Sequence, residues 1–154
     1  MIEDIVRPTL PADATENWRE WHPDGDGRFL DLLGVIRTKC LSTDSACVRF
    51  TPEPMHANRG GLAHGGYLMS CVDEALFHSA AALELTAAKG SGVTVSANVN
   101  FIGAASIDAP IDAITRIVGE TGRMFFISGH MEQEGRRIAS FEGILRKLKN
   151  AGVN

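Results

Sequence analysis

The segment from Asn58 to Asp73 joins a glycine-rich polar loop to the start of an apolar-periodic helix. Gly65 and Gly66 stand at that start, where free backbone N–H groups and the helix dipole favour an oxygen that carries negative charge. Asp73 follows His64 by nine residues, which places a carboxylate about two and a half turns into the helix. Attack on a carbonyl group needs both a donor for the oxyanion and a nucleophile or activated water. The segment therefore predicts an active site.

The sequence leaves the role of each residue in this segment open. His64 either has a direct role or only caps the helix, and Asn58 is either a site residue or only a turn former. Asp73 acts either as a general base or as a nucleophile that forms a mixed anhydride. The spacings between His56, His64 and Asp73 match no compact metal-binding motif, so we expect no metal.

The composition excludes several classes of protein. A chain of 154 residues with 44% hydrophobic and 22% charged residues fits one ordinary soluble domain. A net charge of −4 argues against nucleic acid as a partner. No run approaches the roughly 18 apolar residues of a membrane span, and we find no targeting signal, so we expect a cytoplasmic protein. Three cysteines without a C-x-x-C pair make a disulfide framework improbable.

Hydrophobic periodicity predicts the elements that must position the segment. A helix is predicted over 65–83, and the stripe that should face a sheet consists of Leu68, Val72, Ala75, Leu76 and Ser79. Strands are predicted near 30–39, 46–52, 93–103, 110–119, 123–134 and 136–148. Short turns join most neighbouring strands, which requires antiparallel pairing. We therefore expect an α+β fold in which an antiparallel sheet of about six strands wraps around one long central helix.

The chain divides into two parts in this prediction. Residues 1–29 carry prolines, acids and two tryptophans, and they are predicted to form an N-terminal arm with one short helix near 17–21. Residues 30–150 are predicted to form a single domain that contains the sheet, the long helix and the candidate active site.

The order of elements and the loop resemble the hotdog-fold acyl-CoA thioesterases, through Asn58, Gly61, His64, Gly65, Gly66 and Asp73. Among these, the chain is most similar to the branch typified by the bacterial phenylacetate-pathway thioesterase (PaaI-like), over roughly residues 30–148. The resemblance implies a hotdog domain that hydrolyses an aryl- or medium-chain acyl-CoA. It implies no separate cofactor, because CoA is part of the substrate.

The resemblance also assigns roles to residues. Asp73 would be the catalytic carboxylate, and Gly65 would donate its backbone N–H to the thioester oxygen. Asn58 would hold the attacking water or the Asp73 side chain, while His64 would orient the loop or the carbonyl. Thr94, on the first strand after the helix, would supply a hydroxyl group.

We also have expectations for the residues that bind the substrate and for the oligomeric state. Gly66 is expected to bind substrate, and Arg123 is our first candidate for the cation that holds the CoA phosphates. The resemblance implies a homodimer or a dimer of dimers, hence a homotetramer, with each active site at a subunit interface. Thr94 would then act on the helix of the neighbouring subunit.

Other activities of related proteins stay open at this point. A branch that acts on 4-hydroxybenzoyl-CoA carries Gln and Glu where this chain has Asn58 and Asp73, and a threonine in place of Phe77, which argues against that branch. A non-catalytic acyl-CoA-binding module would be expected to lack the carboxylate. A hotdog hydratase or dehydratase would need Asp73 and His78 to converge, although they lie about 140° apart around the helix.

Overall fold

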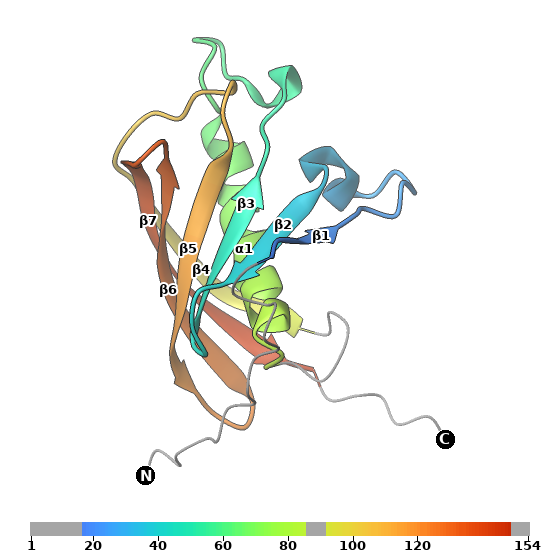
Figure 1. Ribbon diagram of the computed structural model, residues 1–154, viewed down its shortest axis with the longest axis vertical. Coiled ribbons are helices and arrows are strands. Elements are labelled where there is room, and N and C mark those ends of the chain that lie inside the picture. Colours follow the sequence, from blue (N-terminus) through green and yellow to red (C-terminus); the bar gives the residue numbers. More distant parts are fainter. Residues whose placement is uncertain (1–16, 86–91, 149–154) are drawn as a thin grey trace.

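The computed structural model describes residues 17–85 and 92–148, which form one seven-stranded sheet and one α-helix (Figure 1). The strands are β1 (Arg19–Trp21), β2 (Ile36–Cys40), β3 (Ser45–Phe50), β4 (Gly92–Phe101), β5 (Ile111–Glu120), β6 (Met124–Gln133) and β7 (Arg136–Lys147). The helices are α1 (Gly65–Ala82) and two short 3₁₀ helices, η1 (Phe29–Leu33) and η2 (Pro54–His56).

The strand order is β1-β2-β3-β5-β6-β7-β4, and every pair of neighbours is antiparallel. β4 follows α1 in the chain but lies beside β7, so β4 and β1 are the two edges of the sheet. α1 packs against β2, β3, β4, β5 and β7, and Figure 1 shows the sheet curving around it. The predicted α+β class and the sheet wrapped around one long helix are confirmed.

The core lies between α1 and the inner face of the sheet. All five residues of the predicted stripe, from Leu68 to Ser79, are buried. Gly143 on β7 allows the close approach, because a Cβ at this position would overlap the side chain of Leu76. Removing the apolar stripe from water is the main term that holds the helix on the sheet.

The sheet has seven strands rather than about six, and the additional strand is β1. Its residues fall where we predicted a short helix near 17–21, and that prediction is wrong. Arg19 to Trp21 instead pair with β2, and the indole Nε1 of Trp21 donates a hydrogen bond to Thr38 Oγ1 at 3.0 Å. Residues 19–21 therefore form a strand because they pair with β2, and not because of a preference in their own sequence. The division into an arm at 1–29 and a domain at 30–150 stays a prediction.

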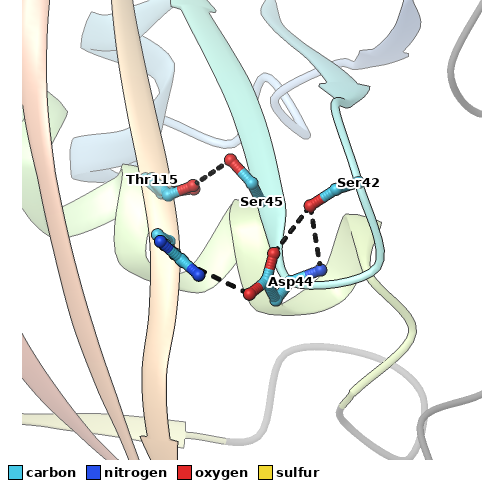
Figure 2. A network of polar contacts seen from close by, with 5 residues as sticks. Ser42, Asp44, Ser45 and Thr115 are labelled. Atoms are coloured by element: carbon cyan, nitrogen blue, oxygen red, sulfur yellow. Dashed lines mark hydrogen bonds and ion pairs between the residues drawn. The ribbon is translucent and has the colours of Figure 1, made fainter.

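A polar network holds the hairpin of β2 and β3 on β5 (Figure 2). Ser42 Oγ donates to Asp44 Oδ1 at 2.6 Å, and Asp44 Oδ2 accepts a hydrogen bond from Arg116 Nε at 3.3 Å. Ser45 Oγ donates to the backbone oxygen of Thr115 at 2.8 Å. The network therefore joins the first part of the sheet to the strands that follow α1.

Candidate active site

The start of α1 is capped by His64. The His64 side-chain Nδ1 accepts a hydrogen bond from the backbone N–H of Gly66 at 2.9 Å, and the His64 backbone N–H donates to the backbone oxygen of His56 at 2.8 Å. The Gly66 N–H is therefore already used within the cap. Within the described part of the chain, the Gly65 N–H donates to no acceptor, so Gly65 offers a free donor at the positive end of the helix.

Asn58 shapes the loop that leads to this cap. Its side-chain Oδ1 accepts the N–H groups of Gly60 at 2.8 Å and Leu62 at 3.1 Å, and Gly61 adopts a left-handed φ of 79°. This side-chain-to-backbone pattern fixes the turn. The oxygen of the Asn58 side chain is thus used within its own loop, and because Asn58 is exposed, its Nδ2 is the end that could meet a ligand.

A buried aromatic pair, one residue in η2 and one in α1, packs beneath the loop that precedes α1. The ring of His56 stacks on Tyr67 with centroids 4.0 Å apart. His56 Nδ1 accepts the Glu53 N–H at 2.8 Å, so Nε2 carries the proton and donates to the Leu32 backbone oxygen at 2.6 Å. Sequence reasoning considered His56 only as a metal ligand, because its partners in η1 and α1 are distant along the chain.

Asp73 lies on the flank of α1 that faces β4, and its side chain is half-buried. Thr94 Oγ1 on β4 donates to Asp73 Oδ1 at 2.6 Å within the same chain. The expectation that Thr94 acts on the helix of a neighbouring subunit stays a prediction, and this hydrogen bond forms within one chain. The physical reason is that β4 lies directly beside α1 of its own chain.

The donor and the acid lie at different ends of the region where α1 packs against β4. Gly65 and Asp73 are eight residues apart, or about 12 Å along the helix axis. A Cβ at Gly65 would lie 3.6 Å from the ring of Phe101 at the end of β4, whereas Thr94 lies near its start. We call Asn58, His64, Gly65 and Phe101 the donor half, and Asp73 with Thr94 the acid half. No carbonyl group can touch both halves of one chain.

Arg123 lies in the exposed turn between β5 and β6. Its backbone oxygen accepts the Lys147 N–H at 2.8 Å, and Lys147 pairs in register with Gly92 at the start of β4. Arg123 is therefore at the same end of β4 as the acid half. The structure does not bring it to the donor half of its own chain.

Cys71 is fully buried in α1, two residues before Asp73. Burial raises the pKa of its thiol above the usual value, so the thiol stays protonated at neutral pH and is a poor nucleophile. Among the described residues, no group of three or more His, Cys, Asp or Glu side chains could hold a metal ion. None of the described helices is both long enough and apolar enough to cross a membrane.

Comparison with known sequences identifies relatives of this chain. The sequence profile of the thioesterase superfamily matches residues 60–140, a range that includes Gly65, Asp73 and Thr94. A Pseudomonas aeruginosa protein named as a candidate esterase is 30% identical over 116 residues, which are 75% of this chain and 85% of that protein. These matches cover the helix and most of the sheet.

Comparison with solved structures gives the fold. A mutant of the phenylacetic acid degradation protein PaaI from Thermus thermophilus is 23% identical, with a TM-score of 0.60 over 78% of this chain and 98% of the other. A hypothetical thioesterase from Streptococcus pneumoniae, solved with coenzyme A, is 18% identical, with a TM-score of 0.62 over 88% of this chain and 89% of the other. The chain therefore belongs to the thioesterase superfamily and has the hotdog fold.

Proposed function

We propose that this protein hydrolyses the thioester bond of an aryl- or medium-chain acyl-CoA to a free acid and CoA. The observation that carries the proposal is the half-buried Asp73, which accepts a 2.6 Å hydrogen bond from Thr94 and lies on the helix that begins at the free Gly65 amide. The superfamily and the relative solved with coenzyme A support this substrate class. CoA arrives as part of the substrate, so no separate cofactor is needed.

In the proposed reaction, the Gly65 N–H stabilises the oxyanion that forms at the thioester carbonyl. Asp73 either takes a proton from water, whose hydroxide adds to the carbonyl, or attacks the carbonyl itself and forms a mixed anhydride that water then hydrolyses. In both routes the C–S bond breaks, CoA leaves as the thiolate and is protonated, and the acid is released. Thr94 orients the Asp73 carboxylate, and His64 holds the helix start in place. Asn58 Nδ2 is available to hold the water.

The separation of the donor half from the acid half requires that two copies of the chain build each site. β4 is a ten-residue strand at the edge of the sheet, and most of its residues are exposed, including Val95 at 55%. A long exposed edge strand is a template for pairing with another chain. Pairing of β4 with its copy would complete the sheet across a two-fold axis.

Antiparallel pairing also brings the correct halves together. With the axis near Asn98, the start of one β4 lies beside the end of its copy, about 4.8 Å away. Asp73 and Thr94 of one chain then face Gly65 of the partner subunit. Arg123, which lies at the acid-half end, would be on the side from which the CoA phosphates approach, and Gly66 of the partner subunit would line the same helix start. A dimer of dimers would keep this two-copy site unchanged.

The experiment that tests the function measures release of free CoA thiol from a panel of phenylacetyl, hydroxybenzoyl, short-, medium- and long-chain acyl-CoAs. Asp73→Asn should lower turnover by about 10²- to 10⁴-fold, the usual contribution of a positioned acid or base, and leave acyl-CoA binding nearly intact. Glu74→Gln is the matched control, because Glu74 lies on another side of α1, 3.5 Å from His78 Nε2, and should leave turnover nearly unchanged.

Two results would contradict the proposal. Turnover of Asp73→Asn above about a tenth of wild type would remove Asp73 from the chemistry, because loss of a general base costs more than this. Binding of acyl-CoA to the folded wild type without any turnover would instead favour a non-catalytic binding module.

A further inference from the structure

His56 ends the short helix η2 and begins the loop that precedes α1. The loop is closed at its base, because Ala57 and Ala63 form an antiparallel bridge and the His64 backbone N–H donates to the His56 backbone oxygen at 2.8 Å. His56 and His64 are therefore the two ends of one closed loop, and Gly65 is the first residue beyond it.

The side chain of His56 is buried, with 8% of the residue exposed, and both of its ring nitrogens are paired. Nδ1 accepts the Glu53 backbone N–H at 2.8 Å, and Nε2 donates to the backbone oxygen of Leu32, 24 residues earlier in η1, at 2.6 Å. The two partners are backbone groups of separate segments of the chain. They therefore hold the ring in one orientation and one neutral tautomer.

The same ring also contacts the first turn of α1. It stacks on the buried ring of Tyr67, with centroids 4.0 Å apart and planes inclined by 15°. Tyr67 follows Gly65 by two residues. His56 therefore holds the chain on both sides of Gly65, by a backbone hydrogen bond to the residue before it and by a ring contact to the turn after it.

The direction of the Gly65 N–H depends on these two contacts. The peptide unit between His64 and Gly65 is planar and rigid, so it turns as a whole when the backbone at either end moves. A free N–H stabilises an oxyanion only when it lies about 2.7–3.1 Å from that oxygen. A misplacement of about 1 Å can lower the rate by about a hundredfold. A residue that fixes this peptide unit can therefore affect catalysis without touching the substrate.

We propose that His56 is a positioning residue, which holds the Gly65 N–H in the direction that the oxyanion requires. This inference rests on the proposed thioesterase function. Because the ring is buried and both of its nitrogens are paired with backbone groups, His56 takes no part in bond cleavage.

The test measures kcat and KM by CoA release for two variants that divide the contacts of the His56 ring. His56→Phe keeps a ring on Tyr67 but removes both hydrogen bonds, and it should lower kcat by about tenfold to a hundredfold. His56→Gln removes the ring but keeps an amide that can both accept and donate, so its loss should be smaller, about threefold to tenfold. KM should change little in both variants, because the substrate loses no contact.

Combination with Gly65→Pro separates a positioning role from a general loss of structure. Gly65→Pro has already lost the donor, so a second change at His56 has no donor to misplace and should lower the residual kcat by less than about twofold. A defect elsewhere in the fold would instead multiply with that of Gly65→Pro, because independent effects add in free energy.

The matched control is Thr38→Val. Thr38 is buried on β2, next to the edge strand β1 and away from β4 in the strand order, and its hydroxyl accepts the hydrogen bond from Trp21 Nε1 at 3.0 Å. The variant loses this hydrogen bond, so it should lower the midpoint of thermal unfolding and leave kcat at the wild-type value.

Two results would overturn the inference while the thioesterase function stands. One is wild-type kcat in folded His56→Phe, and the other is a loss in His56→Phe that is fully retained in the Gly65→Pro background. If His56→Phe did not fold, the same two results in His56→Gln, which lacks the stack on Tyr67, would decide. Absence of turnover by the wild type on every acyl-CoA would remove the proposed function and this inference together.

Discussion

The donor half and the acid half hold their chemistry in different ways. In the donor half the reactive group is a backbone N–H, whose direction is set by neighbours close in the sequence, the His64 cap and the Asn58 turn. In the acid half it is a side chain, held by a hydroxyl 21 residues further along the chain. The contacts that hold each half all lie within one chain, but about 12 Å along the helix separates the two halves. This separation is the reason for our proposal that two chains contribute to one site.

The strongest test of the donor half removes the Gly65 N–H alone. Gly65→Pro should lower kcat by about 10²- to 10³-fold, the usual effect of losing an oxyanion donor. Proline is favoured at the first helical position, and the extended conformation of His64, with φ −67° and ψ 138°, suits a residue before proline. Gly65→Ala keeps the N–H, and its Cβ would make an ordinary contact with Phe101. Equal activity of the two variants, measured by CoA release, would exclude this donor.

A smaller effect is expected at the contact that holds the acid. Thr94→Val removes the hydroxyl that donates to Asp73 and should lower kcat by about tenfold to a hundredfold, since a hydrogen bond to a charged group contributes about 1.5–3 kcal/mol. KM should change little, because the substrate does not lose a contact. Thr94→Ser keeps the donor and should restore most of kcat. A Thr94→Val enzyme with wild-type kcat would show that the acid half needs no support from β4.

The smallest effect is expected at His64. His64→Asn keeps a good helix cap and should leave kcat/KM within a few-fold of wild type, whereas His64→Ala should destabilise the protein by about 0.5–2 kcal/mol through loss of the cap. Thermal unfolding and CoA release measure the two effects separately. If His64→Asn were stable but as inactive as Gly65→Pro, His64 would have a direct role in the reaction.

The parts of the fold set by local pattern were predictable from the sequence. The apolar stripe that includes Leu68 and Val72 gave α1 its predicted position, within one residue of its end at Ala82. The strands after α1 were predicted close to their observed ranges, because alternation and short turns are local signals. β1 was not predictable, since three residues near Trp21 become a strand only through their pairing with β2.

In the candidate site, too, the features set by neighbouring residues were predictable, and those set by contacts between distant elements were not. The glycine-rich loop before α1 predicted the donor half, because the residues that cap the start of a helix are neighbours in the sequence. The sequence also singled out Thr94, and the structure places its hydroxyl on Asp73 of its own chain, while its expected role on the helix of a neighbouring subunit stays a prediction. The support from His56 and Tyr67 had no local signal, because it depends on contacts between η1, η2 and α1.

The central claim is that each active site takes its acid from one chain and its donor from another. Mixing the inactive Asp73→Asn and Gly65→Pro proteins under conditions of subunit exchange tests it most directly. Random pairing of a two-fold dimer gives half heterodimers, each with one intact shared site, so activity should recover to about a quarter of wild type. Heterodimers that form, as two different affinity tags would show, but stay inactive would contradict the shared site.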